Sequence, residues 1–248
     1  MTQPFKGTVF QHLEEFRRRL WVSTAVYVAV CLLCFFHADE IMDYIINPIL
    51  PHIGQVCFFS PADAFVVKIK AALLAGLLFS SPVFLSQIWI FISPALYPNE
   101  KKAILPLIFI TSFLFLFGAF FSFYVVLPMT LQFLISQQTA YLKPMVSMSE
   151  YLSFLSGMMI SFGVAFNLPV FILALIASGV TTVKGLNKLQ RHAIVLIVVA
   201  AALLTPGPDI ASQMSLAVPL LILFELSVLA GWVLETVFLK RGRTMVRS

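Results

Sequence analysis

Six apolar stretches, separated by shorter polar segments, limit this chain to folds that lipid can surround. They lie at about residues 20–36, 64–92, 103–134, 151–178, 193–204 and 214–234. A helix that crosses a bilayer needs about 20 apolar residues, because it rises about 1.5 Å per residue through about 30 Å of hydrocarbon. Only 11% of the residues are charged, whereas a soluble domain has roughly 25%. We therefore expect an all-α integral membrane protein.

The fifth stretch decides the topology, because its length of about 12 residues is too short to span a bilayer alone. One reading is a re-entrant segment, which leaves five spans; the other is a short hairpin with the sixth stretch across thinned lipid. Of the 16 Lys and Arg residues, 13 lie in the N-terminal segment, in the links after the second and fourth stretches, and in the tail. Only the hairpin places all 13 on one side, which the positive-inside rule makes the cytoplasm.

The charge pattern therefore predicts six transmembrane helices with both termini in the cytoplasm. We expect a single transmembrane domain over residues 1–248, in which 37–63 form the first periplasmic loop and 235–248 a basic cytoplasmic tail. Within that loop, the apolar residues 45–50 predict a short amphipathic element on the membrane surface.

Prolines and capping residues predict where helices bend, begin and end. Pro82 and Pro169 lie inside long apolar stretches, where a residue without an N–H kinks a helix. Ser147, three residues before Glu150, has the spacing of a capping box at the start of the fourth helix.

A second proline-rich segment separates the last two stretches. Pro206, Pro208 and Asp209 follow one another closely there, around a glycine. Because two prolines and a glycine cannot continue a helix, this segment predicts a rigid tight turn.

The chain lacks the motifs that soluble catalysts and metalloproteins use. Cys31 and Cys34 form a C-x-x-C pattern inside the first stretch, where thiolates have no water and zinc would lack two further ligands. We expect them to be small apolar residues on one helix face. The histidines have no metal-ligand spacing, and no phosphate-binding glycine motif occurs. We therefore expect no metal, no cofactor, no nucleic-acid partner and no enzymatic activity.

Carboxylates at the cytoplasmic edge are the first candidates for a binding site. Glu14 and Glu15 precede Arg18 and Arg19 by four residues, so ordinary helical ion pairs worth about 0.2–0.5 kcal/mol each would account for them. Glu100 follows a good N-cap residue and could simply stabilise a helix start. The functional reading is that Glu15 and Glu100 face one interface and bind guanidinium groups through paired hydrogen bonds.

Asn167 and Glu225 are the polar exceptions within the apolar stretches. Intramembrane polar groups are costly and often functional. Asn167 could instead hydrogen-bond a backbone carbonyl freed near Pro169. Glu225 could be a proton-relay carboxyl or a buried, protonated hydrogen-bond donor. A proton-coupled solute transporter that uses these two residues is therefore one rival function. An intramembrane hydrolase is another, but it lacks a histidine or paired aspartates at membrane depth.

Several long motifs, in order along the chain, resemble those of the TatC family of twin-arginine protein translocase subunits. They are HLEEFRRRL at 12–20, PV at 82–83 with QIWIF at 87–91, PALYPNEKK at 94–102, FGVAFNLPV at 162–170 and LTPGPDIASQ at 204–213. The resemblance covers almost the whole chain. One departure is Asn167, where many relatives carry Glu.

The resemblance implies six helices that form a curved, cupped wall in the bacterial cytoplasmic membrane. It implies a receptor and scaffold that binds the twin-arginine signal peptides of folded proteins, with transport driven by the proton-motive force. Glu15 and Glu100 match the arginine-binding positions of the family, and Arg17 and Phe91 lie in the same motifs. The implied partners are single-span TatA-like and TatB-like proteins, in a homo- and hetero-oligomer within the lipid bilayer.

Overall fold

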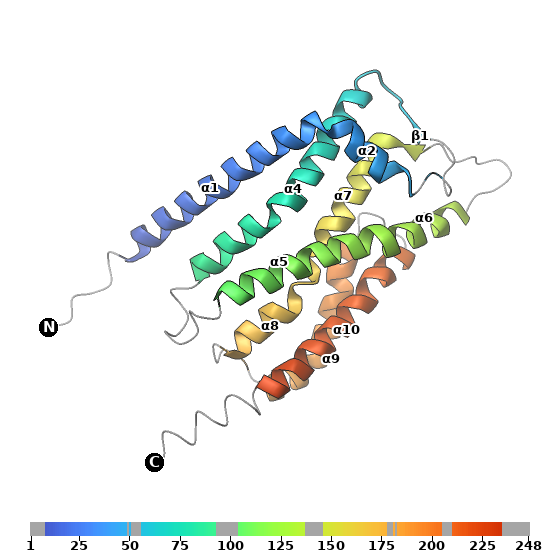
Figure 1. Cartoon of the computed structure of the whole chain (residues 1–248). Helices are drawn as coiled ribbons and strands as arrows, with labels where there is room; N and C mark the ends of the chain where they lie inside the picture. The colour runs from blue at the N-terminus through green and yellow to red at the C-terminus, as the bar shows by residue number, and fades with distance from the viewer. Residues whose placement is uncertain are drawn as a thin grey trace, which may run out of the picture. The chain divides into compact units, whose positions relative to one another are not determined.

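The structure, a computed structural model, is almost entirely helical (Figure 1). It describes residues 8–48, 50, 56–92, 104–136, 146–177, 181, 183–204 and 210–234. The α-helices are α1 (Thr8–Phe36), α2 (Ala38–Ile46), α4 (Asp63–Ile92), α5 (Ile104–Phe121), α6 (Leu127–Ser136), α7 (Met148–Ala165), α8 (Leu168–Ala177), α9 (Val183–Leu204) and α10 (Ile210–Leu234). A π-helical turn, η3 (Ser122–Val126), joins α5 to α6, and β1 (Val56–Cys57) pairs in parallel with β2 (Val146–Ser147).

Four helical segments in the described part of the chain are long and apolar enough to cross a membrane. They are Leu13–Phe36, Asp63–Phe91, Leu105–Phe133 and Met148–Ile176. Two shorter apolar segments, Gln190–Val199 and Leu216–Trp232, lie at the fifth and sixth stretches of the sequence. The prediction of a helical protein with apolar spans is confirmed.

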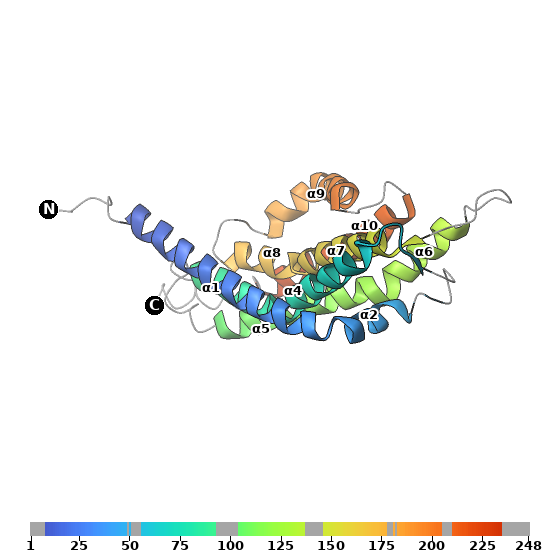
Figure 2. The same ribbon diagram turned by 90° about the horizontal axis from the view of Figure 1, so that it is seen from above.

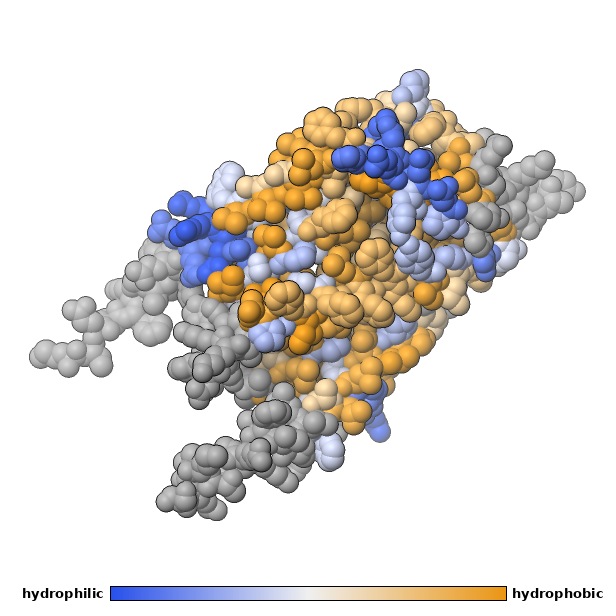
Figure 3. All heavy atoms as spheres, viewed as in Figure 1, coloured by the Kyte–Doolittle hydropathy of each residue, from blue (hydrophilic) through white to orange (hydrophobic). Residues whose placement is uncertain are grey.

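The exposed surface of these helices is apolar where a soluble protein would be polar. Phe36, Phe79 and Trp21 are at least 70% exposed. Figure 3 shows apolar residues over the middle of α1 and α4, with hydrophilic residues gathered where α1 begins and around α2. An apolar band with polar ends is the distribution that lipid, bounded by water, requires.

The chain divides into two compact units. Unit 1 comprises Met1–Pro48 and Phe59–Ser112, and unit 2 comprises Ile49–Phe58 and Phe113–Ser248. Helix α5 crosses the division, because its residues up to Ser112 belong to unit 1 and the later ones to unit 2.

In unit 1, α1 and α4 lie side by side and run antiparallel (Figure 1, Figure 2). A Cβ added at Gly76 of α4 would overlap Cys31 Sγ of α1 and lie 3.1 Å from its Cα, so the two backbones approach closely there. Cys34 packs with Ala72 and Ala75 of α4. Both cysteines are free thiols that fill the seam between two helices, as the sequence predicts.

Pro82 lies inside α4 without ending the helix. A proline at position 82 removes the N–H that would bind the carbonyl of Leu78. Ser81 Oγ donates a hydrogen bond to that same carbonyl oxygen at 2.7 Å. The serine hydroxyl therefore replaces the missing backbone donor, which an apolar environment would otherwise leave unpaired at a cost.

In unit 2, glycines allow α5 and α7 to pack closely. A Cβ at Gly118 would lie 2.6 Å from the carbonyl oxygen of Phe162, and one at Gly163 would lie 2.7 Å from the ring of Phe115. Phe121 and Phe166 pack around this contact with ring centroids 5.5 Å apart. The contact between α5 and α7 is thus surrounded by aromatic rings, with space made by the two glycines.

The predicted cap and kink of the fourth span are both present. Ser147 is the N-cap of α7, and its side chain accepts a hydrogen bond from the backbone N–H of Glu150. The span breaks between α7 and α8, just before Pro169, which cannot donate to the carbonyl of residue 165. The third span stays helical through η3, which ends two residues before Pro128.

Helix boundaries differ from the apolar stretches at three places. Helix α1 begins at Thr8 and α9 at Val183, before the apolar runs that start near 20 and 193, because hydropathy marks the residues in lipid and not the first helical turn. In the first loop, α2 covers Ala38–Ile46 and overlaps the element expected at 45–50 only in its last two residues, while residues 49 and 51–55 lie outside the described residues. This helix ends at Ile46, two residues before Pro48, which has no N–H to continue the helical hydrogen bonds.

Candidate functional site

Glu15 lies on α1 and forms an ion pair with Arg19, one turn further along. Arg19 Nε donates to Glu15 Oε1 at 3.2 Å, and Nη2 donates to the same oxygen. The Arg19 and Glu15 side chains are 20% and 35% exposed. The pair is therefore partly shielded from water, and the carboxylate is held in a position where it binds a guanidinium group.

The same guanidinium links α1 to α4. Arg19 Nη1 donates to Gln87 Oε1 at 3.4 Å, so carboxylate, guanidinium and amide form a chain across the two helices. Sequence reasoning identified Arg19 as the helical partner of Glu15 but missed Gln87. The position of Gln87 in the QIWIF motif is the sequence feature that could have identified it.

Phe91 lies in the last turn of α4, and its ring packs against Phe16. The ring centroids are 5.4 Å apart at an interplanar angle of 55°. Phe16 directly follows Glu15, and Phe16 itself is 45% exposed. The structure thus brings Phe91 to the end of the α1–α4 pair at which Glu15 lies.

Arg17 occupies a different environment from Arg19. Its Nη2 lies 3.6 Å from Glu14 Oε1, and the two side chains are 72% and 75% exposed. An ion pair so exposed contributes little to stability. The spacing predicts Arg18 as the partner of Glu14, but the structure pairs Glu14 with Arg17. Arg17 therefore presents its charge to the surroundings of α1.

Four residues predicted for the site or its scaffold lie outside the described part of the chain. They are Glu100, Pro206, Pro208 and Asp209. The meeting of Glu100 with Glu15 and the tight turn after α9 therefore stay predictions. The basic tail at 235–248 also falls outside the described residues.

Asn167 closes the break between α7 and α8. Its backbone N–H binds the carbonyl of Val164, three residues back, and this leaves the Gly163 carbonyl without its usual backbone donor. The Asn167 side chain supplies that donor, with Nδ2 at 2.9 Å from Gly163 O. The Oδ1 atom is buried without a hydrogen-bond partner among the described residues. The structural alternative for Asn167, a hydrogen bond to a freed backbone carbonyl, therefore holds for the Nδ2 atom of its side chain.

Glu225 joins the last two helices. Gln190 Nε2 of α9 donates to Glu225 Oε1 of α10 at 2.5 Å. Gln213 of α10 also donates to the Val198 carbonyl of α9 at 3.2 Å. These bonds tie the two shorter apolar segments into a hairpin. Sequence reasoning missed Gln190, which precedes the fifth stretch. The reading of Glu225 as a buried donor is wrong, because Glu225 is exposed and its Oε1 accepts this bond.

The described residues contain no group of three His, Cys, Asp or Glu side chains that could hold a metal ion. A half-buried carboxylate beside aromatic rings binds a cation with an apolar neighbour.

Comparison with known proteins gives one consistent family. The model of the TatC family, described as Sec-independent protein translocase protein, matches residues 11–219. The chain is 38% identical to the Sec-independent protein translocase protein TatC of Helicobacter pylori strain J99 over 218 residues, which cover 88% of this chain and 86% of the relative. It is 36% identical to the same protein of Magnetococcus marinus, over 91% of this chain and 84% of the relative.

Solved structures agree with the sequence relatives. A crystal structure titled as the twin arginine translocase receptor TatC in DDM superimposes with a TM-score of 0.79 at 34% identity. The match covers 89% of this chain and 99% of that one. Relatives that are translocase components disfavour both the solute transporter and the hydrolase as functions of this chain.

Proposed function

The chain belongs to the TatC family of Sec-independent protein translocase components, and from this premise we propose that it is the receptor that binds twin-arginine signal peptides. Glu15 and Glu100 are the proposed ligands of the two arginines, and Arg17 and Phe91 border the site. The observation that carries the proposal is the half-buried Glu15 carboxylate, which already binds one guanidinium group, that of Arg19.

The geometry suits a peptide that carries arginines before an apolar segment. A guanidinium that reaches Glu15 competes with Arg19 for a carboxylate held in place on α1. Phe16 and Phe91 provide adjacent apolar rings. Burial of apolar peptide surface there contributes about 25 cal/mol per Å2 if the unbound peptide is in water. The contribution is smaller if the unbound peptide is in lipid.

We further propose the topology that the charge pattern predicts, with six spans, a curved wall and both termini in the cytoplasm. The fifth apolar segment, Gln190–Val199, has 10 residues, which rise only about 15 Å. A segment shorter than the hydrocarbon layer thins the bilayer nearby. Such thinning would lower the barrier for a folded protein to cross.

The remaining proposals concern assembly and energy. We propose that the chain acts in the bacterial inner membrane with single-span TatA-like and TatB-like partners, driven by the proton-motive force. Asn167, which is half-buried in unit 2 and whose Oδ1 has no hydrogen-bond partner among the described residues, is the polar residue that we propose to contact such a helix. Glu225 lies exposed on α10 and is a second polar contact.

The test of the receptor function compares two neighbouring carboxylates. The full chain in lipid nanodiscs is titrated with a fluorescent signal peptide that contains two arginines. A charged hydrogen bond contributes about 1.5–3 kcal/mol; since Glu15 is partly exposed, we expect Glu15→Gln to weaken binding about tenfold. Glu14→Gln, which removes the same charge at an exposed neighbouring position, should change binding less than twofold.

A second peptide, with both arginines replaced by lysines, examines the recognition chemistry. Lysine cannot form the paired hydrogen bonds of a guanidinium, so we expect it to bind less tightly than the arginine peptide. Equal binding of both peptides, or equal effects of Glu14→Gln and Glu15→Gln, would contradict the proposed site.

A further inference from the structure

A buried hydrogen bond that the proposed site does not include joins Trp89 of α4 to Thr111 of α5. The indole Nε1 donates to Thr111 Oγ1 at 3.2 Å. Trp89 is 7% exposed and Thr111 is 2% exposed. Both residues belong to unit 1, as do Gln87 and Phe91 of the candidate site.

The Thr111 hydroxyl is satisfied in both directions. It donates within its own helix, where the Leu107 carbonyl oxygen lies at 2.8 Å, and it accepts from the indole N–H of Trp89. An indole nitrogen can only donate, and a buried donor without a partner is costly in an apolar environment. The pair therefore fixes the direction of the Trp89 side chain toward α5.

The burial of Trp89 distinguishes it from a tryptophan that anchors a helix at the membrane surface. Anchoring tryptophans place the ring among lipid headgroups, and the exposed Trp21 of α1 fits that description. The Trp89 ring is instead enclosed by protein. Its N–H therefore serves the contact with α5.

Helical spacing puts Trp89 on the side of α4 opposite to the candidate site. Gln87 and Phe91 are four residues apart and share one side of the helix. That side contacts α1 through Arg19 and Phe16. Trp89 stands midway between Gln87 and Phe91, about 160–200° away around the helix axis. The last turns of α4 are thus held between α1 on one side and α5 on the other.

Pro82 explains why the last turns of α4 need a contact on this second side. It precedes Trp89 within the same helix, and a proline weakens the backbone hydrogen bonds and is the usual point at which a helix bends. Before Pro82, the backbones of α1 and α4 approach closely at Gly76. After it, the contacts with α1 described above are made by side chains. A directional hydrogen bond to α5 limits the bending and rotation of this last segment.

We propose that Trp89 is a positioning residue of the signal-peptide site, and that its hydrogen bond to Thr111 sets the orientation in which the end of α4 presents Gln87 and Phe91 to α1. The inference rests on the proposed receptor function, because Gln87 accepts from the same guanidinium that occupies Glu15. Trp89 acts through Gln87 and Phe91 and is not itself a ligand of the peptide.

The first test is the nanodisc titration of the full chain with the twin-arginine peptide, well below the unfolding temperature, where a loss of stability alone leaves the affinity unchanged. Thr111→Val removes the hydroxyl and keeps the side-chain shape. We expect it to weaken binding by up to about fivefold, the factor that corresponds to one neutral hydrogen bond. Trp89→Phe should act in the same direction. In the Trp89→Phe background, Thr111→Val should change binding less than about twofold, because its partner is already gone.

A second readout does not involve the peptide. A para-fluorophenylalanine at position 91 reports the orientation of α4 through its fluorine chemical shift, because the ring of Phe16 lies beside it with centroids 5.4 Å apart. We expect Thr111→Val to shift or broaden this signal, since it releases the last turns of α4 without altering either ring.

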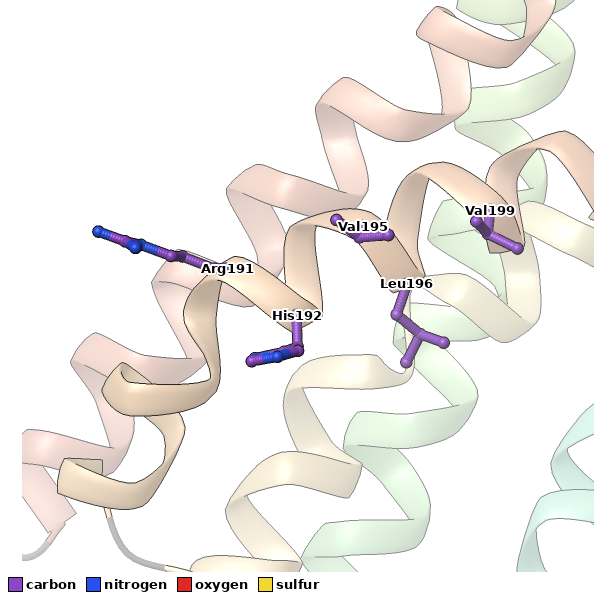
Figure 4. A pocket seen from close by; sticks show the side chains of 5 residues that line it. All are labelled: Arg191, His192, Val195, Leu196 and Val199. Atoms are coloured by element: carbon purple, nitrogen blue, oxygen red, sulfur yellow. The ribbon is translucent and has the colours of Figure 1, made fainter.

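Two control variants accompany both readouts. Ser112→Ala removes a neighbouring buried hydroxyl that has no hydrogen-bond partner among the described residues. Val195→Ala removes side-chain volume in unit 2, where Val195 lines a hollow on α9 (Figure 4). Neither control should change peptide binding or the fluorine signal.

Three results would overturn the proposal. They are unchanged peptide binding in both single variants, additive effects of Trp89→Phe and Thr111→Val, and an unchanged fluorine signal in Thr111→Val. Glu15→Gln separates this proposal from the receptor function. If Glu15→Gln weakens binding and Thr111→Val does not, only the positioning role is wrong. If Glu15→Gln leaves binding unchanged, the receptor function fails; a shifted fluorine signal then still supports the orientation of α4 by Trp89, and an unchanged signal overturns it.

Discussion

Arg19 occupies the carboxylate of Glu15, the residue that we propose for the arginines of a signal peptide. The two side chains lie one turn apart on α1, and the guanidinium of Arg19 also reaches Gln87 of α4. An arginine of this chain therefore stands where an arginine of the ligand would bind. Docking of a signal peptide is then an exchange of one guanidinium for another.

This exchange predicts the effect of Arg19→Gln. Removal of the internal competitor should tighten the binding of a twin-arginine peptide by up to about fivefold, because a partly exposed ion pair contributes about 0.2–1 kcal/mol. The measurement is the same nanodisc titration, with Arg18→Gln as a control for the lost charge. Weaker binding in Arg19→Gln alone would show instead that Arg19 positions Glu15, and the competition model would be wrong.

A second prediction concerns the hydroxyl that compensates for Pro82. Ser81→Ala leaves the Leu78 carbonyl in α4 without a donor, so we expect it to destabilise the protein by about 0.5–1.5 kcal/mol. Ser80→Ala is the matched control. Ser80 Oγ donates to the carbonyl of Leu77 at 3.3 Å, but this carbonyl also accepts the backbone N–H of Ser81 in the helix, so it keeps a donor when the hydroxyl is removed. Thermal unfolding in detergent measures both.

A double substitution tests whether the Ser81 hydroxyl replaces the backbone donor that Pro82 lacks. Pro82→Ala restores the backbone N–H, so in that background Ser81→Ala should cost less than half of its effect in the original chain. If the two substitutions are additive, the hydroxyl does not replace the missing donor.

Hydropathy and proline positions predict much of this fold because they act locally. The apolar stretches give the spans, Pro169 gives the break before α8, and Ser147 gives the start of α7. The start of α9 at Val183 was not predictable in this way, since its first turns are polar and helical but lie before the apolar run.

The candidate site was only partly predictable, because it depends on residues far apart in sequence. The pair of Glu15 with Arg19 follows from helical spacing. The contact of Arg19 with Gln87, 68 residues away, depends on the register of α1 against α4, which the close contact at Gly76 sets. No local pattern encodes that register. Phe91 entered the site through family resemblance, and its contact with Phe16 gives it a physical place there.

A third prediction concerns the close approach of α5 and α7 in unit 2. In Gly118→Ala the new methyl group would lie 2.6 Å from the Phe162 carbonyl oxygen and 2.8 Å from the Phe166 side chain. Overpacking of this kind typically costs about 1–3 kcal/mol. We expect a lower unfolding temperature, whereas Val164→Leu, at a position 58% exposed, should change it little. An unchanged temperature in Gly118→Ala would mean that the helices can separate freely.

The last prediction distinguishes the two ends of the Asn167 side chain. Its donor end, Nδ2, satisfies the Gly163 carbonyl at the break between α7 and α8, and its acceptor end, Oδ1, is the proposed contact for a partner helix. Asn167→Leu removes both, so it should lower the unfolding temperature and also the recovery of single-span partners in a pull-down. Asn167→Ser keeps a hydroxyl that can donate over a short reach only.

Partner recovery and stability separate the two roles of Asn167. Ser153→Ala provides the control, since Ser153 is an exposed residue of α7 that also donates to a helix carbonyl, that of Ser149, at 2.9 Å; we expect neither readout to change. If Asn167→Leu lowers the unfolding temperature but leaves partner recovery intact, the residue only closes the helix break. If partner recovery falls more than the loss of stability explains, Asn167 also contacts the partner helix.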